Sequence, residues 1–419
     1  MSDIKKVIIV GGGMAGLIAA LQLTRQNGFA CTVYELRDAP TTLGGAIGIP
    51  CNGLRLLHRL GIYDALLARG AQTPRVEMHS SRGASLGFMD VASWNQEHTG
   101  FGYLRIKRVD LLEILLDAVE KAQIPIRYSK KLIGIKEDAA QVTATFADGT
   151  SDTADLLVGC DGIHSAVRTL HVDPGLQPTY SGLSTMYSIL DLSKRGPSFP
   201  RFSTPHATRT PKGIFIIFPC KPNGEEIFWF YTQEVQISEE HNTRDGWEEE
   251  RKHVVDSFKD HALDLLSDVR GDWGAQLKQV VGATDNVNFY PLFKLPFGGT
   301  WSKGRTVIIG DAAHAMPPHA SQGVAMAAED VFVLSRKLQE QSLSLAEIFQ
   351  QYDQVRRPRV EYFHKLAVKN GDVRKQQSPW GLWAIEMMTY ISLMAMDKLG
   401  LVKFGFGMGP WIHDVDKQE

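Results

Sequence analysis

The chain is poor in cysteine. Its 419 residues include only four, Cys31, Cys51, Cys160 and Cys220. No two of them form a C-x-x-C pair, so the sequence predicts neither a zinc module nor a redox dithiol. Widely spaced free thiols are typical of a reducing compartment, and we expect a cytoplasmic protein. The histidines lack metal-ligand spacing, and no metal site is expected.

The sequence also lacks an excess of charge of either sign. Its 45 Lys and Arg residues nearly balance 47 Asp and Glu residues, which gives a net charge of −2. Nucleic-acid binding depends on a basic excess, so nucleic acid is not an expected partner. The composition is that of a globular protein, and the length predicts about two to three domains. A charged run at residues 248–252 is interpreted as a solvated helix face.

Long apolar runs are missing as well. The apolar stretch Trp380–Met396 contains Glu386, and it is shorter than the ~20 residues that span a bilayer. We therefore expect a helix buried against the protein, with a membrane-surface helix as the alternative. The run Lys5–Val10 near the N-terminus is too short for a signal peptide and reads as a first β-strand.

Hydrophobic periodicity predicts an α/β protein. A βαβ unit is expected over Lys5–Val10, Met14–Gln26 and Ala30–Tyr34, and an amphipathic helix over Arg108–Ala122. Alternating strands from about residue 180 to 295 indicate an inserted, mostly antiparallel sheet. We expect a discontinuous Rossmann-like domain over 1–75, 101–178 and 290–345, a β-sheet domain over 76–100 and 179–289, and a helical region over 346–419.

A glycine-rich turn follows the first predicted strand. Gly11, Gly13 and Gly16 form G-x-G-x-x-G at the start of a helix, where backbone amides attract a pyrophosphate. Glu35 ends the second strand at the offset of an acid that binds a ribose diol. The pattern fits FAD or NAD, whereas a carboxylate at this position disfavours the 2′-phosphate of NADP.

Two further motifs pair aspartate with glycine after buried strands. Asp161-Gly162 is the first, and Gly310-Asp311 is the second. A carboxylate beside a glycine is suited to accept hydrogen bonds from a polyol chain. A predicted helix after Gly323 aims its amides at an electron-rich ring edge.

Together these motifs resemble the FAD-dependent aromatic hydroxylases, single-component flavoprotein monooxygenases of the para-hydroxybenzoate hydroxylase type. The resemblance covers about residues 5–60, 104–170 and 290–370, and the C-terminal tail is similar to fungal members of secondary metabolism. It implies the glutathione-reductase-like (GR2) FAD fold of that type, and it implies that FAD is held by Gly11, Gly13, Met14, Ala15, Gly16, Glu35, Arg37, Arg108, Asp161, Gly162, Asp311, Pro318, Gln322, Gly323 and Val324.

Two positions depart from the family pattern beside the expected flavin ring. The family commonly has Pro-x-x-Gly-Gln-Gly followed by a small residue and Asn. Here Ser321 replaces the glycine and Ala325 stands at the asparagine position, whereas Glu329 and Asp330 are retained. The placement or mobility of the ring is therefore expected to differ.

The resemblance implies a monooxygenase reaction. NADH or NADPH reduces FAD, O₂ adds as a flavin 4a-hydroperoxide, and one oxygen passes to an aromatic or enolic small molecule. The sequence lacks H-E-x-x-H and a Walker loop, so the oxidising chemistry is left to the cofactor. The alternatives are an FAD-dependent dehydrogenase, reductase or halogenase, and a membrane-associated flavoprotein.

The substrate chamber is expected between the inserted sheet and the flavin. Phenols react faster as phenolates, so a general base is expected, with His314, His319, Tyr187 and Tyr231 as candidates. We expect a monomer or a homodimer. Candidate lining residues are Tyr187, Phe215, Ile217, Trp229, Tyr231 and the segment Pro291–Phe293.

Overall fold

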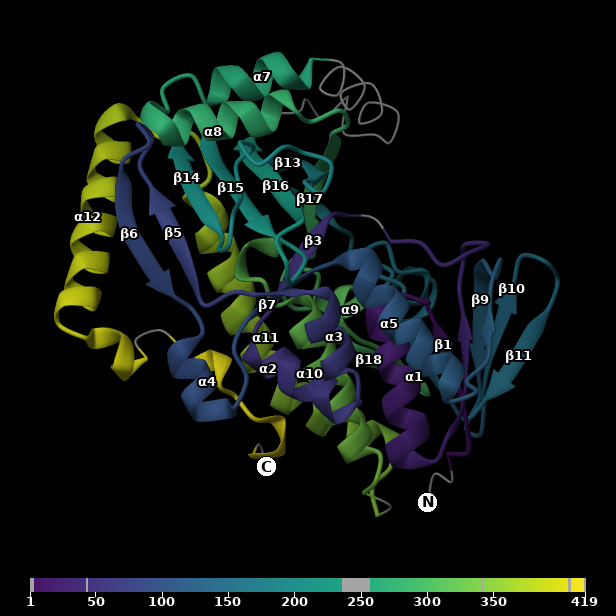
Figure 1. Cartoon of the computed structure of the whole chain (residues 1–419). Coiled ribbons are helices and arrows are strands. Elements are labelled where there is room, and N and C mark those ends of the chain that lie inside the picture. The colour runs from purple at the N-terminus through teal and green to yellow at the C-terminus, as the bar shows by residue number, and fades with distance from the viewer. Residues whose placement is uncertain (1–3, 43, 236–256, 341, 406–407, 418–419) are drawn as a thin grey trace.

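The computed structural model describes residues 4–42, 44–235, 257–340, 342–405 and 408–417. The charged run at 248–252 lies outside these residues. Within them, the strands form four sheets, and the helices gather around a six-stranded sheet and at one face of a seven-stranded sheet (Figure 1).

The six-stranded sheet has the order β18-β19-β12-β1-β2-β8. β18 runs antiparallel to β19, and the remaining pairs are parallel. Val7, Ile8 and Ile9 are each 0% exposed, and because successive strand side chains point to opposite faces, both faces of the sheet are covered. The strands are β1 (Lys6–Val10), β2 (Ala30–Tyr34), β8 (Ile126–Arg127), β12 (Leu156–Gly159), β18 (Ser302–Lys303) and β19 (Thr306–Ile308).

Helices α1 (Met14–Asn27) and α5 (Arg108–Lys121) lie beside this sheet (Figure 1). α1 follows β1 directly and leads into β2, so the expected βαβ unit is found with nearly the predicted bounds. Two three-stranded antiparallel sheets flank this region. They are β11-β10-β9, of β9 (Leu132–Glu137), β10 (Val142–Phe146) and β11 (Ser151–Ala154), and β3-β7-β4, of β3 (Ala46–Ile49), β4 (Ala71–Gln72) and β7 (Leu104–Lys107).

The seven-stranded sheet has the order β17-β13-β16-β15-β14-β5-β6, and its pairs are antiparallel except β14 with β5. One face packs on α7 (Phe258–Leu265) and α8 (Gly271–Gly282) (Figure 1). The strands are β5 (Arg75–His79), β6 (Ser85–Asp90), β13 (Thr179–Asp191), β14 (His206–Thr210), β15 (Gly213–Pro219), β16 (Glu226–Glu234) and β17 (Asn288–Lys294).

The remaining helices include α2 (Cys51–Arg59), α3 (Tyr63–Arg69), α4 (Ser93–Thr99) and the short α9 (Asp311–His314), and the C-terminal region is helical as expected. There α10 (Gly323–Lys337), α11 (Leu345–Asp372) and α12 (Pro379–Lys398) follow one another. Ser344 and Glu347 form a capping box that starts α11. The α/β fold class inferred from the sequence is confirmed.

The helix expected at Trp380–Met396 is present as α12, but the prediction that it is buried is wrong for one of its faces. Leu382 and Leu393 are buried, whereas Trp380 is 79% exposed and Met388 61% exposed. Periodicity cannot distinguish these states, because α12 is apolar on more than one side.

Candidate functional site

The turn between β1 and α1 has the geometry of a phosphate cradle. Gly11 has φ +109°, and a Cβ there would lie 2.5 Å from the carbonyl oxygen of Cys160, so only glycine fits. A Cβ at Gly16 would lie 1.9 Å from the oxygen of Gly11, which shows how closely α1 approaches the strand. Gly13, by contrast, faces open space, and the first turn of α1 has no acidic residue. Met14 and Ala15 form that turn.

Glu35 directly follows β2 beside this turn. Its carboxylate accepts the Gly12 N–H at 2.7 Å and the Arg37 N–H at 2.9 Å. The Arg37 guanidinium donates to the hydroxyl of Thr41. Arg108, the first residue of α5, reaches the same loop, because a Cβ at Gly44 would lie 2.8 Å from its Cδ. The structure thus brings the glycine-rich turn, Glu35 and both arginines together near the ends of β1 and β2.

Asp161 follows β12 and bonds its own loop. Its carboxylate accepts from the Ser165 hydroxyl at 2.5 Å, from Ala166 N–H at 2.7 Å and from Val167 N–H at 3.1 Å. Burial outweighs these hydrogen bonds and raises the pKa of Asp161. Gly162, next to it, has φ +77° and open space around its α-carbon. The side chain of Asp161 therefore builds the loop.

Arg168 is a residue to which the sequence analysis gave no role. It is 0% exposed. Its guanidinium donates to the carbonyl of Ile163 at 2.5 Å and to that of Ala312 at 2.7 Å. The second bond ties the loop after β12 to the loop after β19. Its place at the end of the Asp161 motif was the available signal.

Asp311 contrasts with Asp161. It begins α9 and is exposed. In the described part of the chain, no donor lies within hydrogen-bond distance of its carboxylate. The preceding Gly310 has φ +59°, and its N–H donates to Asp330 at 2.9 Å, which fixes the turn. The carboxylate is thus held at the end of the sheet and left open for a ligand.

His314 does not face this open site. It is 5% exposed, and its Nε2 lies 2.6 Å from the Asp330 carboxylate, with the Trp301 ring packed at 5.3 Å. A base must reach the substrate proton, and His314 is occupied by Asp330. Its placement supports a structural role.

Asp330 and its neighbour Glu329 belong to a buried ionic network that joins α10 to α11. Arg356 donates to Asp330 at 2.8 Å and to Glu329 at 2.6 Å, and Arg359 forms a bidentate pair with Glu329 at 2.5 and 2.6 Å. Burial by itself would raise the pKa of Glu329, but the two arginines outweigh it and lower the value to about 2.

Asn52, which sequence reasoning missed, connects this network to Gln322. Its side-chain amide donates to Glu329 at 2.8 Å and to the Gln322 Oε1 at 3.0 Å. The Gln322 Nε2 is therefore directed away from Asn52, and it is buried without an acceptor. No local pattern could reveal Asn52, because it lies in α2, far from Gln322 in the sequence.

Gln322 precedes α10, and the N-terminus of this helix is open. A Cβ at Gly323 would have no neighbour within 4 Å, and α10 has no acidic residue in its first turn. Pro318, in the loop before α10, is exposed, and Val324, in the first turn of α10, is half-buried. Ser321 has φ +53°, the left-handed conformation in which glycine is favoured. Ser321 occupies the position where the family commonly has glycine. The backbone therefore keeps the left-handed conformation that glycine favours, although the residue is serine.

These observations fit a bound FAD. Open amides at α1 suit a pyrophosphate, the free carboxylate of Asp311 suits a polyol, and the unpartnered amide of Gln322 suits an acceptor on the ring. Ala325 is fully buried against Gly53, which leaves no polar group at the position where the family commonly has asparagine.

The two faces of the seven-stranded sheet separate the expected substrate residues. Phe215, Ile217, Trp229 and Tyr231 belong to the cluster packed on α7 and α8. Burial raises the pKa of Tyr231, and its hydroxyl bonds Thr210 at 2.6 Å. The expected catalytic role of Tyr231 does not fit this placement, because its strand turns it away from the flavin loops.

Tyr187 lies on the opposite face, beside Phe228 with ring centroids 5.6 Å apart. This face meets the FAD half of the fold, since a Cβ at Gly45 would lie 1.8 Å from the Phe228 ring. Of Pro291–Phe293, Phe293 contacts His164, close to the loop of Asp161, with ring centroids 6.1 Å apart.

A basic cluster of His319, Arg374 and Arg209 lies beside the flavin loop. The His319 Nε2 and the Nε atoms of both arginines are buried without hydrogen-bond partners. Burial and Arg374 lower the pKa of His319 well below its usual range, and burial and Arg209 lower that of Arg374 to about 10. Gly371 lies between the His319 ring and Leu183 of β13. The cluster therefore sits between the loop before α10 and the seven-stranded sheet.

Arg105 of β7 adds a half-buried cation near this face. Its guanidinium lies 4.2 Å from the centroid of Phe218 and 5.2 Å from that of Tyr103. Its Nε has no hydrogen-bond partner, and burial lowers its pKa. Buried polar nitrogens without a partner are costly, so Arg105 and the basic cluster indicate an anionic ligand.

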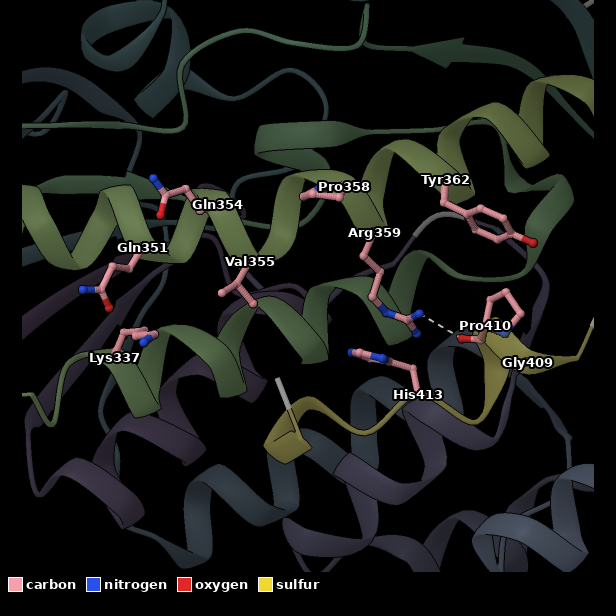
Figure 2. A pocket seen from close by; sticks show the side chains of 10 residues that line it. All are labelled: Lys337, Gln351, Gln354, Val355, Pro358, Arg359, Tyr362, Gly409, Pro410 and His413. Carbon is pink, nitrogen blue, oxygen red and sulfur yellow. Dashed lines mark hydrogen bonds between the residues drawn. The ribbon is translucent and has the colours of Figure 1, made fainter. Parts of the chain in front are cut away.

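A separate groove of 1040 Å³ lies between α10, α11 and the C-terminal tail (Figure 2). Arg359 crosses it and donates to the carbonyl of Pro410 at 2.9 Å. None of its lining residues belongs to the glycine and aspartate motifs. Hydrogen bonds connect the groove to Gln322 through Arg359, Glu329 and Asn52.

Comparison with known proteins decides the family. The model of the FAD binding domain family matches residues 5–282 and 298–367. The chain belongs to this family. The resemblance inferred from the three motifs is confirmed, and so is FAD as the cofactor.

The flavoprotein has curated relatives along most of its length. It is 33% identical over 369 residues to 3-amino-4-hydroxybenzoate 2-monooxygenase PtmB3 of Streptomyces platensis, covering 87% of each chain. It is 26% identical over 393 residues to salicylate hydroxylase of Pseudomonas putida, covering 89% of this chain and 87% of the relative. The chain is an FAD-dependent enzyme of the monooxygenase class, as predicted.

Solved structures show the same fold. Klebsiella pneumoniae HpxO complexed with FAD and uric acid aligns with a TM-score of 0.77 at 22% identity, covering 93% of this chain and 94% of that chain. A tetrameric form of 2-methyl-3-hydroxypyridine-5-carboxylic acid oxygenase aligns with a TM-score of 0.71 at 21% identity, covering 89% and 92%. Across the described residues, no helix has the length and apolarity that crossing a membrane requires.

Proposed function

We propose that this flavoprotein hydroxylates a hydroxy-aromatic substrate that carries an anionic group, with NADH or NADPH as electron donor and O₂ as oxidant. The observation that carries the proposal is the set of half-buried arginines on the flavin-facing side of the sheet whose Nε atoms are buried without a hydrogen-bond partner, above all Arg374. The relatives support it, since their names specify hydroxylated aromatic acids: 3-amino-4-hydroxybenzoate and salicylate.

Bound FAD supplies the activation of O₂, and this chain holds it in place. Gly11, Gly13, Gly16 and the first turn of α1 would receive the pyrophosphate, and Glu35 would bind the ribose. Asp311 would bind the ribityl chain, and Gln322 with Gly323 would meet the ring. Arg37 and Arg108 would lie beside the adenosine half, whereas Asp161 shapes its loop through the hydrogen bonds of its carboxylate and Gly162 through its positive φ.

His319 replaces Tyr231 and His314 as our candidate general base. Its Nε2 is buried and unpartnered, and the lowered pKa keeps the imidazole neutral at neutral pH, so it can accept a proton. The phenolic O–H donates its proton to this nitrogen, and Arg374 stabilises the phenolate that forms. Tyr187 remains a candidate for orienting the ring from β13.

The test compares charged and neutral substrates on the holoenzyme. NADH and NADPH oxidation in air is measured with hydroxybenzoic acids and with their methyl esters, together with product mass. We expect the acids to stimulate oxidation at least tenfold more than the esters and to gain one oxygen. Arg374→Gln should raise the KM for the acid, and the exposed Arg201→Gln serves as the matched control.

Two negative outcomes have different meanings. Equal stimulation by acids and esters would overturn the anionic substrate class and leave the monooxygenase assignment intact. NAD(P)H-dependent reduction of another acceptor, with no oxygen in any product, would favour the dehydrogenase or reductase alternative. A halogenase would require halide-dependent product formation.

We further propose the domain division given by the sequence, and it is supported by sheet membership. The predicted β-sheet segments 76–100 and 179–289 supply β5 and β6 together with β13–β16 and the start of β17. A cytoplasmic location is also proposed, and it is supported by four buried free cysteines.

A further inference from the structure

α12 is attached to the molecule by one of its faces. Leu393 packs on Gly87 of β6, where an added Cβ would lie 3.2 Å from the Leu393 Cβ. The Glu386 carboxylate accepts the Ser81 N–H at 2.6 Å, and Ser378 caps the helix start. The inner face is thus satisfied, and α12 lies along β6 at the edge of the molecule (Figure 1).

The outer face of α12 carries a regular apolar stripe. Successive stripe residues are separated by three, four, three and four positions, which is the spacing of a helix–helix seam. Met388 and Ile391 flank the stripe and are 61% and 52% exposed. The stripe consists of Trp380 (79% exposed), Trp383 (55%), Met387 (40%), Tyr390 (44%) and Met394 (43%).

The stripe is of the size that a stable interface uses. Taking roughly 200 Å² for each large side chain, these seven exposed residues present an area on the order of 750 Å². Each partner in a standard interface buries about 800 Å². Exposed apolar patches of this extent mark interaction sites.

We propose that α12 pairs with α12 of a second copy of this chain, antiparallel about a two-fold axis near Met387. A helix partner is favoured because the stripe has seam spacing, and a self-complementary partner because the stripe carries no charge of either sign. Such pairing places Trp380 of one copy against Met394 of the other, a sulfur–aromatic contact.

A bilayer surface fits this face less well. Surface-binding helices carry cations beside the apolar face, which contact anionic headgroups. The exposed charged residues of α12 are Asp397 and Lys398, both at its C-terminal end. The helix also lies beyond the 5–282 and 298–367 match to the family model, so the pairing is a property of this chain and not of the family core.

Sedimentation velocity on the FAD-loaded full chain is the first test. We expect wild type to dimerise, and Met387→Lys, which brings two like charges together at the axis, to raise the dimer dissociation constant at least tenfold with unchanged flavin absorbance. Ile133→Lys, at a residue 51% exposed on β9, is the matched control and should remain dimeric.

Cysteine cross-linking tests the two-fold geometry, because the four native cysteines are buried. Met387→Cys should form disulfide-linked dimers by itself, whereas Trp380→Cys should cross-link only when mixed with Met394→Cys. A monomeric wild type, a dimer insensitive to Met387→Lys, or monomers that float with phosphatidylcholine–phosphatidylglycerol vesicles would each overturn the proposal.

Discussion

Two loops of this molecule begin alike and end differently. After β12 and again after β19, a strand leads into a glycine–aspartate pair. The carboxylate of Asp161 accepts hydrogen bonds from three donors of its own loop. Asp311 is exposed, and its turn is fixed by the hydrogen bond from Gly310 to Asp330. The same residue type beside a glycine after a strand thus builds one loop and leaves a binding group in the other. For these two aspartates, the carboxylate that is already satisfied is structural and the one that is not is open to a ligand.

The largest effect, a loss of kcat, is expected from a second pair of residues, His319 and Tyr231. Again one side chain lacks a hydrogen-bond partner and the other has one. His319→Gln removes an unpartnered buried nitrogen and should lower kcat about 10²-fold or more if it acts as the base. Tyr231→Phe removes a hydroxyl already bonded to Thr210 and should leave kcat unchanged. Steady-state kinetics of both variants checks this, and equal effects on kcat would refute the distinction.

Asp161→Ala should mainly cost stability. Three hydrogen bonds to a buried carboxylate are lost, and the buried hydroxyl of Ser165 loses its acceptor, so we expect about 2–4 kcal/mol less stability of the apoprotein. Urea unfolding measures this. Wild-type stability of the variant would show that the loop does not depend on the carboxylate.

Asp311→Ala should mainly cost FAD. The carboxylate has no partner among the residues that the structure describes, so apoprotein stability should change by less than about 0.5 kcal/mol. The lost charged hydrogen bond to the ribityl chain should weaken FAD binding by about 1.5–3 kcal/mol, which is a 10- to 100-fold rise in Kd. Flavin titration decides, and an unchanged Kd would contradict the assigned role.

The paired histidines His79 and His206 predict an acid-sensitive sheet. Their ring nitrogens lie 3.0 Å apart, and burial, with His79 and Arg75, lowers the pKa of His206 to about 4. This neutral form contributes stability above the unfolded pKa of about 6.5, and the contribution is lost as the pH falls toward 4. His206→Gln should flatten this acid limb in thermal unfolding, and an unchanged limb would exclude the pair as its source.

The smallest effect concerns Ser321. Its left-handed φ costs a non-glycine residue about 1 kcal/mol, so Ser321→Gly should stabilise the protein by about 0.5–1 kcal/mol, despite the added freedom of the unfolded chain. Thermal unfolding with and without FAD measures it. A destabilised variant would show that the serine hydroxyl makes a compensating contact.

The FAD half of the fold was predictable because its signals are local. The spacing of Gly11, Gly13 and Gly16 and the offset to Glu35 specify a turn and an adjacent strand end. In the seven-stranded sheet, alternation predicts which residues share a face but not which face meets the flavin. Tyr231 was therefore expected in the chamber, and it lies against α7 and α8.

The buried ionic network could not be predicted from the sequence, for a different reason. Asn52 lies in α2, Gln322 and Glu329 belong to the start and the body of α10, and Arg356 lies in α11, so only packing brings the three helices together here. The exposure of α12 was equally hidden, because its composition suits a buried helix. For the buried network and for α12, the sequence predicted the secondary structure. The contacts and the exposure depend on the tertiary fold.

Oxygen transfer from isotopically labelled O₂ tests the central claim most directly. The FAD-loaded protein is incubated with NAD(P)H and a hydroxybenzoic acid that stimulates NAD(P)H oxidation. The mass of the product is then measured by mass spectrometry. A monooxygenase predicts one labelled oxygen in the product for each product molecule formed. A product whose added oxygen comes from water, or an oxidised product without added oxygen, would contradict the account.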